Sequence, residues 1–214
     1  MSSNLNPEKA LIFRIVHIRN VPKILEHGGL FARTVPEQDP NYVNIGNSEL
    51  IGKRASRPVP IPPGGMLNDY VAFYFTPFSM MMLNIKTGHN GITKRPNKDI
   101  VIFVSSIHRL EEQRLTYVFT NGHAYMAEAE FYRSTDSLDQ IDWPLLQRRD
   151  FKSDPNDFSK QFRYQAEALV HRHLPLASLV GIVCYNGSAR DSLTEMVNKW
   201  QLNLEIKTLP QFYF

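Results

Sequence analysis

Glu167 has the surroundings that most call for a chemical explanation. It stands in the segment 163–170 (RYQAEALV), which predicts a strand with Ala166, Ala168 and Val170 on one face and Glu167 on the other. A carboxylate in an apolar strand is costly to bury unless it is paired or hydrogen-bonded. Glu167 is therefore a candidate catalytic acid, base or ligand-holding group. The alternative is a strand glutamate that faces water.

A group of basic residues forms a second candidate site. Lys53, Arg54 and Arg57 stand at the end of an expected helix, just before the Pro-rich segment 57–65. The planar guanidinium of an arginine at this place could hold a pyrophosphate. The alternative is a solvated helix end whose positive charges suit the helix dipole.

Further basic residues are typical of nucleic-acid binding. Segment 86–98 holds several Lys and Arg and no acidic residue, and Arg148, Arg149 and Lys152 follow the aromatic-rich segment 117–143. Cationic grooves interleaved with aromatic rings bind single-stranded nucleic acid. A solvated surface remains the alternative.

Other motifs give weaker indications. His171-x-His173 could place two imidazoles on one strand face as metal ligands, or could be two polar residues at a strand end. Cys184 stands within an apolar run and is expected to be a small buried residue rather than a nucleophile. The glycine-rich nucleotide-binding fingerprints and the H-E-x-x-H motif are absent from the sequence.

Composition indicates a soluble globular protein. The chain has 214 residues, of which 43% are hydrophobic, 21% charged and 11% aromatic, and its net charge is +3. A single cysteine excludes an intrachain disulfide and fits a reducing compartment. The first residues lack the pattern of a signal peptide, and no apolar stretch is long enough to span a bilayer. We expect a cytoplasmic protein with no membrane contact.

The expected elements are short and interspersed. Strands are predicted over 10–18, 70–75, 99–106, 117–120, 179–185 and 202–207, besides the one that carries Glu167. Helices are predicted over 21–27 with Asn20 as cap, from Asn47 or Ser48 onward, over 78–85, and over 188–200 with Leu193, Val197 and Trp200 on one face. Residues 30–46 are expected to form a loop, and 123–162 show no long periodic pattern. The sequence thus predicts one α+β domain over residues 1–214.

Several segments, in this order, resemble the DarT family over nearly the whole chain from Asn6 onward: 44–55 (NIGNSELIGKRA), 59–65 (VPIPPGG), 69–79 (DYVAFYFTPFS), 118–124 (VFTNGHA), 137–143 (SLDQIDW) and 163–169 (RYQAEAL). DarT proteins are bacterial toxins that ADP-ribosylate thymine in single-stranded DNA and are encoded beside a macrodomain antitoxin, DarG. The resemblance implies an ADP-ribosyltransferase-like fold, with two small, mainly antiparallel sheets around an NAD cleft and short helices. It implies NAD as co-substrate, no metal, and single-stranded DNA and DarG as partners.

The resemblance also assigns roles to residues. It makes Glu167 the catalytic glutamate and Arg54 the catalytic, NAD-contacting arginine, within an NAD-binding element from about Gln38 to Ser56. It implies further cofactor contacts at Arg14, Ile15, Val16, Lys23 and Phe31. The region 123–167 would recognise the substrate, and the implied DNA contacts are Gly46, Phe78, Ser79, Met80, Met81, Met82, Leu83, His123, Arg149 and Asp150.

The chain departs from the family pattern at three positions. The family commonly has His where this chain has Arg14, and proline where it has Ala72 and Met80. A backbone contact at Arg14 would survive the exchange, whereas a side-chain role would change. Because proline fixes φ and removes a donor, its absence predicts a more mobile DNA-facing loop.

The implied chemistry breaks the glycosidic bond of NAD through an oxocarbenium-like transition state. Glu167 would stabilise the developing positive charge, hydrogen-bond a ribose hydroxyl and help to deprotonate the base. Arg54 would pair with the diphosphate and stabilise the deprotonated base. The rival hypotheses are transfer to protein or RNA, plain NAD hydrolysis, and a nucleic-acid-binding module that makes no bond.

Overall fold

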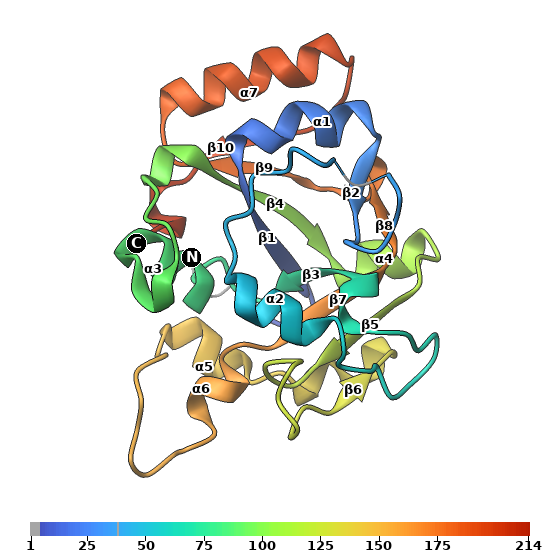
Figure 1. The fold of residues 1–214 in the computed structure, drawn as a ribbon, viewed down its shortest axis with the longest axis vertical. Coiled ribbons are helices and arrows are strands. Elements are labelled where there is room, and N and C mark those ends of the chain that lie inside the picture. The colour runs from blue at the N-terminus through green and yellow to red at the C-terminus, as the bar shows by residue number, and fades with distance from the viewer. Residues whose placement is uncertain (1–4, 38) are drawn as a thin grey trace.

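The computed structural model describes residues 5–37 and 39–214, whose strands form one large and one small sheet (Figure 1). The large sheet has the strand order β10-β9-β4-β1-β3-β7-β5-β6, and the small sheet pairs β2 with β8. The strands are β1 (Leu11–His17), β2 (Gly29–Phe31), β3 (Tyr70–Tyr74), β4 (Ile100–Ser106), β5 (Tyr117–Thr120), β6 (Phe131–Tyr132), β7 (Glu167–His171), β8 (His173–Pro175), β9 (Gly181–Cys184) and β10 (Ile206–Thr208).

The large sheet is nearly divided in two between β1 and β3. β1 pairs with β4 along its whole length, from Leu11 to His17, but pairs with β3 only where Phe13 faces Tyr74. β3 in turn pairs with β7 over its full length. The sheet therefore consists of two four-stranded halves, β10-β9-β4-β1 and β3-β7-β5-β6, that meet at one residue pair.

The expected α+β class, with mainly antiparallel strands, is confirmed. The arrangement differs in one respect from two small separate sheets, because the Phe13–Tyr74 pair joins both halves into one. The exception to antiparallel pairing is β9 with β10. The helices are short apart from α7: α1 (Val21–Glu26), α2 (Ser48–Arg54), α3 (Met80–Thr87), α4 (Ile107–Glu112), α5 (Trp143–Arg148), α6 (Lys160–Arg163) and α7 (Gly187–Lys199).

The main hydrophobic core extends through the elements from Leu5 to Tyr213. The expected alternation of β7 is confirmed: Ala168 and Val170 pack into the main core, while Leu169 packs into a smaller cluster on the other face. β4 is buried along its whole length, as its apolar sequence predicts. At one end of the molecule α1 and α7 lie side by side (Figure 1).

Several local predictions were wrong. The strand that carries Glu167 begins at Glu167, because residues 160–163 form α6, in which the Arg163 N–H donates to the Ser159 carbonyl. β2 lies in a segment expected to be a loop, and β6, α5 and α6 lie where no pattern was found. Trp200 follows α7 and is 41% exposed. The Asn20 side chain bonds with the Val43 backbone and does not cap α1.

Candidate active site

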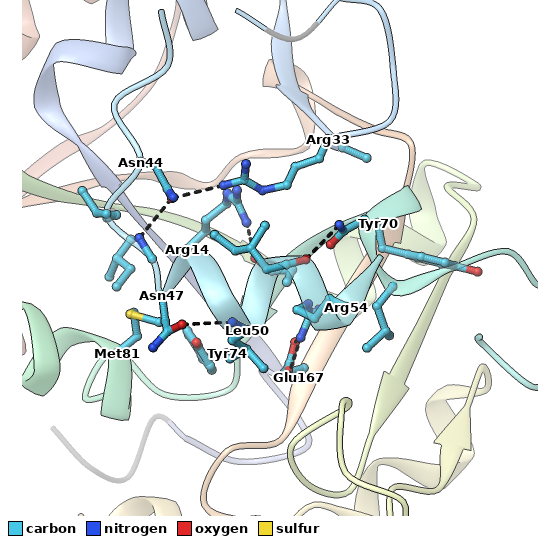
Figure 2. Close-up of a pocket in the computed structure, with 18 of the residues that line it drawn as sticks. Arg14, Arg33, Asn44, Asn47, Leu50, Arg54, Tyr70, Tyr74, Met81 and Glu167 are labelled. Atoms are coloured by element: carbon cyan, nitrogen blue, oxygen red, sulfur yellow. Dashed lines mark hydrogen bonds and ion pairs between the residues drawn. The ribbon is translucent and has the colours of Figure 1, made fainter. Parts of the chain in front are cut away.

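A cleft opens where β1 and β3 diverge (Figure 2). Its walls come from β1, β2, the following loop to Asn47, α2, β3, α3 and the start of β7. Three arginines, Arg14, Arg33 and Arg54, and one carboxylate, Glu167, line the same cleft.

Glu167 is buried at 3% exposure and accepts hydrogen bonds from two directions. Arg54 Nη1 lies 3.1 Å from Oε1 and 2.9 Å from Oε2, and the Ala124 backbone N–H donates to Oε1 over 3.1 Å. His123 Nδ1 lies 3.3 Å from Oε1. Such donors offset the cost of burying a charged carboxylate. The water-facing alternative for Glu167 is therefore wrong.

Two elements hold this ion pair in place. Glu167 is the first residue of β7, where its N–H donates to Thr120 Oγ1 of β5 and where it faces Tyr74 of β3. Arg54 is the last residue of α2. α2 begins as predicted, since the Asn47 side chain accepts from the Leu50 N–H over 2.9 Å.

The environment of Glu167 also affects its neighbours. Burial lowers the pKa of His123, although the nearby Glu167 carboxylate opposes that change. The imidazole is therefore neutral at neutral pH. Burial, reinforced by the Glu167 charge, raises the pKa of Tyr74 well above its usual range, so its hydroxyl remains a hydrogen-bond donor.

The three arginines give the cleft a strong positive potential. Arg33 is exposed at the rim, and partial burial together with repulsion from Arg14 lowers its pKa. Arg14 Nη1 donates to the Ala72 carbonyl over 2.7 Å, in the gap between β1 and β3. Arg14 Nε and Arg54 Nη2 are buried without a hydrogen-bond partner in the described part of the chain. Unpaired guanidinium donors around one cleft suit an anion such as a diphosphate.

The expected cofactor residues are mostly brought together. Arg14, Ile15, Phe31 and Arg54 line the cleft. Lys23 lines a smaller adjoining cavity, bounded also by Arg14 and Phe31, and pairs with Glu26 over 2.7 Å. Val16 is fully buried in the core and does not line either cavity. Gln38, the first residue of the expected NAD-binding element, lies outside the described residues.

The expected DNA residues fall into two groups. Gly46, Met81 and His123 line the cleft. The others lie around the start of α3 and the end of α5: Phe78, Ser79 and Met82 are buried, Met80 and Leu83 are half-buried, the Arg149 guanidinium lies 3.4 Å from the Phe78 ring centroid, and Asp150 pairs with Lys160.

The remaining sequence candidates have local structural roles. Among the basic residues at the end of α2, Lys53 pairs with Glu49 and Arg57 donates to the Met126 carbonyl, so Arg54 alone lines the cleft. The segments 86–98 and 148–152 are largely exposed. Exposure is compatible both with nucleic-acid binding and with a solvated surface.

The proposed pair of metal-ligating histidines does not share a strand face. Arg172 has φ of +62° between β7 and β8, so His171 packs against Tyr70 while His173 stacks on Phe31. Over residues 5–37 and 39–214, no group of three or more His, Cys, Asp or Glu side chains is arranged to hold a metal. Cys184 is fully buried, as predicted, and burial raises the pKa of its thiol.

Tyr42 and Asn44 line the cleft from within the expected NAD-binding element, whereas three other cleft residues were missed from the sequence: Arg33, Tyr70 and Tyr74. One signal could have found the last two. In β3, Val71 and Phe73 belong to the main core, whereas Tyr70, Ala72 and Tyr74 alternate with them and line the cleft. The Arg33 side chain is held by Asn44 Oδ1 at 3.1 Å, a contact between loop residues that no periodicity reveals.

The buried Glu167–Arg54 pair thus lies in an arginine-lined cleft between two half-sheets, an arrangement suited to an anionic dinucleotide. The family model described as ssDNA thymidine ADP-ribosyltransferase, DarT, matches residues 13–214. The chain belongs to this DarT family.

Individual relatives agree. A DNA ADP-ribosyl transferase of Escherichia coli O127:H6 is 50% identical over 213 residues, which cover 100% of this chain and 97% of the relative. Thermus sp. 2.9 DarT in complex with ADP-ribosylated ssDNA matches with a TM-score of 0.88 at 29% identity, covering 97% of this chain and 98% of that one. The same Thermus protein in complex with NAD⁺ matches with a TM-score of 0.86 at 28% identity, covering 97% and 99%.

Proposed function

We propose that this chain transfers ADP-ribose from NAD to a ring nitrogen of thymine in single-stranded DNA, and that this modification depends on the surrounding sequence and blocks DNA replication, making the protein a toxin. The observation that carries the proposal is the Glu167–Arg54 pair in a cleft with two further arginines. Family membership supports it, as do the Thermus DarT complexes with NAD⁺ and with ADP-ribosylated ssDNA.

Glu167 acts on the reacting ribose and base. The bond from the ribose C1′ to nicotinamide breaks and neutral nicotinamide leaves, so positive charge develops on the ribose. The Glu167 carboxylate, held by Arg54 and the Ala124 N–H, stabilises that charge. The thymine N3 proton passes to a base as the N3–C1′ bond forms, and Glu167 is the candidate base.

The arginines orient the dinucleotide. Arg54 has a buried Nη2 donor free for the diphosphate while its Nη1 holds Glu167, which links cofactor position to the catalytic carboxylate. Arg14, Lys23 and Phe31 lie on the side of the cleft that continues into the adjoining cavity, and we assign the rest of the NAD molecule to them. Arg33, at the rim between both cavities, completes the anion site.

The acceptor base enters beside Gly46, Met81 and His123, which line the cleft near Glu167. An unpaired base reaches such a cleft without the cost of unstacking a duplex. The start of α3 and Arg149 bind the flanking strand. Neutral His123 is a hydrogen-bonding group suited to the polar edge of a base.

Residues 1–214 act as one catalytic domain, since the main core joins elements from Leu5 to Tyr213. The partner proposed from family membership is the macrodomain antitoxin DarG, and the proposed location is the cytoplasm. In the described part of the chain, no helix has the length and apolar character needed to traverse a bilayer.

Mass spectrometry tests this function. A mixed-sequence single-stranded DNA is incubated with NAD and the purified protein, with Glu167→Ala and with protein and RNA acceptors in parallel. ADP-ribose on thymine that is absent with the variant is the expected result, and fragment masses give the sequence context. NAD consumed without DNA modification would favour another acceptor or hydrolysis, and NAD left intact by folded protein would favour a binding module.

A further inference from the structure

Phe158 is the most exposed large hydrophobic side chain in the described part of the protein. Its exposed fraction is 91%, whereas the next most exposed large hydrophobic residues, Met126 and Val180, are each at 43%. Single exposed apolar residues are common on protein surfaces and often need no explanation. The backbone around Phe158 is what distinguishes it.

An ion pair on one side and a hydrogen bond on the other fix the residues beside the ring. Arg163 donates to both carboxylate oxygens of Asp157, over 3.0 and 2.7 Å, and also to the Ser159 hydroxyl. Hydrogen bonding from Arg163 lowers the pKa of Asp157 to about 2, so this pair persists at neutral pH. The two neighbours of Phe158 are thus tied to one guanidinium, while the ring between them contacts solvent.

The rest of the loop is fixed in the same way. The Lys160 side chain, only 8% exposed, pairs with Asp150 at 3.1 Å and Asp154 at 3.4 Å. Residues 148–163 hold five basic and three acidic residues, and all three acidic ones are paired within this segment. The exposed charges that remain are therefore Arg148, Arg149 and Lys152, which are positive.

A series of contacts connects the cleft with this loop. Met81 of α3 lines the cleft, Phe78 precedes α3, and Arg149 at the start of the loop lies over the Phe78 ring. From Arg149 the chain runs out to Phe158 in the loop that projects from the body of the molecule beside α5 and α6 (Figure 1). The cleft, the positively charged residues at the start of the loop and the exposed Phe158 ring therefore lie one after another.

We propose that Phe158 is a stacking platform for an unpaired base of the single-stranded DNA, several nucleotides away from the modified thymine. This inference rests on the proposed function and adds a second base-binding position to it. Every base has a face that stacks on an aromatic ring, so the contact adds affinity for single strands with little sequence preference. Because the loop is held by ion pairs, little conformational freedom is lost on binding.

Oligonucleotide length tests the proposal. Steady-state rates are measured with thymine-containing DNA of about 4 and about 16 nucleotides, a span that covers known single-strand site sizes. Phe158→Ala and Phe158→Leu are expected to raise the KM for the long DNA about tenfold, to leave the KM for the short DNA and for NAD unchanged, and to leave kcat unchanged. Phe158→Tyr is expected to behave as the unsubstituted protein, because it keeps the ring.

A binding measurement separates this inference from the proposed function. Phe158→Trp places an exposed indole at the tip of the loop, and its fluorescence is expected to be quenched by long single-stranded DNA without NAD. Equal KM values for Phe158→Ala and the unsubstituted protein on long DNA, or unquenched fluorescence, would overturn the stacking position while thymine modification stood. If no thymine were modified, the proposed function would fail, and fluorescence quenching of Phe158→Trp by single-stranded DNA would still show whether the side chain at this position binds single strands.

Discussion

The Glu167 carboxylate accepts hydrogen bonds from Arg54 at the end of α2 and from the Ala124 N–H in the segment after β5, and His123 Nδ1 lies 3.3 Å from it. A carboxylate held in this way has a fixed orientation before any ligand binds. Catalysis by electrostatic stabilisation depends on such preorganisation. Substitution of single residues is therefore the most direct test of the proposed chemistry.

Glu167→Gln is expected to lower kcat for thymine modification about a thousandfold, since it keeps the size and removes the charge. NAD binding and folding are expected to persist, as measured by calorimetry and circular dichroism. Glu195→Gln, at an exposed glutamate of α7, is the matched control and is expected to retain activity. Activity of Glu167→Gln close to that of the unsubstituted protein would remove Glu167 from the mechanism.

Arg33→Gln is expected to raise the KM for NAD about tenfold with a small effect on kcat, because Arg33 contributes charge to the diphosphate and does not contact Glu167. The value follows from losing one charge-assisted hydrogen bond at a partly exposed position. Arg190→Gln, on the exposed face of α7, is the control. A change in kcat with an unaltered KM would assign Arg33 to the chemical step instead.

His123 makes stability depend on pH. Burial lowers its pKa below 6.5, so the unfolded chain takes up a proton more readily than the folded one as pH falls through this value. The free energy of unfolding therefore decreases below about pH 6.5. In His123→Gln, which cannot titrate, the difference between urea unfolding at about pH 7.5 and about pH 5.5 is expected to shrink. His89→Gln, at an exposed histidine, is expected to keep the full difference.

The sequence predicted the central residues Glu167 and Arg54 but not all the residues that surround them in the cleft. Glu167 became a candidate because a charge in an apolar strand is anomalous, and Arg54 was one of three basic residues at an expected helix end. The resemblance to the DarT family singled out both as catalytic. Arg33 was missed because an arginine in a loop has no local signal, and its place in the cleft depends on Asn44 and on the path of the chain between them.

Among the elements, α2 is a short helix of low intrinsic stability that nevertheless positions a proposed catalytic residue. It has seven residues, none of them buried, and it carries Arg54 on its last turn. A helix this short is not stable by itself in water. It is held by its Asn47 cap and by Asn68 Nδ2, which donates to the Ile51 carbonyl over 3.1 Å.

Asn47→Ala is expected to destabilise α2 by about 1 kcal/mol, because the Leu50 N–H loses its acceptor. The expected readouts are faster hydrogen exchange of α2 amides and a raised KM for NAD. Asn47→Asp keeps the cap and adds a favourable charge at the helix start, so it is the control. Slow exchange in Asn47→Ala equal to that of the unsubstituted protein would show that packing alone fixes α2.

The start of β7 was the element least well predicted. Period-two alternation extended the strand back to Arg163, but Arg163 and Lys160 bind carboxylates of the preceding loop and belong to a helical turn. Strand propensity was overridden by ion pairs formed with residues up to 21 positions distant, Asp142 among them. The alternation itself held from Ala166 to Val170.

At the scale of the molecule, ligand binding and folding are linked through the cleft. NAD at about 100 times its dissociation constant is expected to add about 2.7 kcal/mol to the free energy of unfolding. Thermal unfolding of Glu167→Gln, used so that NAD is not consumed, measures this effect. Nicotinamide alone, which lacks the diphosphate, is the matched ligand and is expected to give little shift. Equal increases in unfolding temperature with NAD and with nicotinamide would show that the arginines do not bind the diphosphate.

The sequence predicted the class of fold, since most strands and helices have clear local patterns. It could not predict how strands far apart in the chain pair with one another. β1 separates from β3 after Phe13, and the Arg14 guanidinium bonds to the Ala72 carbonyl across the gap. No pattern local to β1 contains this information.

The single Phe13–Tyr74 pair between β1 and β3 gives the large sheet an uneven stiffness. Within each half, continuous hydrogen-bonded ladders resist bending, whereas backbone pairing between the halves is limited to one residue pair, supplemented by the hydrogen bond from Arg14 to the Ala72 carbonyl. We expect the molecule to bend most easily at this boundary between the two half-sheets. A dinucleotide lying across it would brace the two halves, so the rigidity needed for transfer would come partly from the substrate itself.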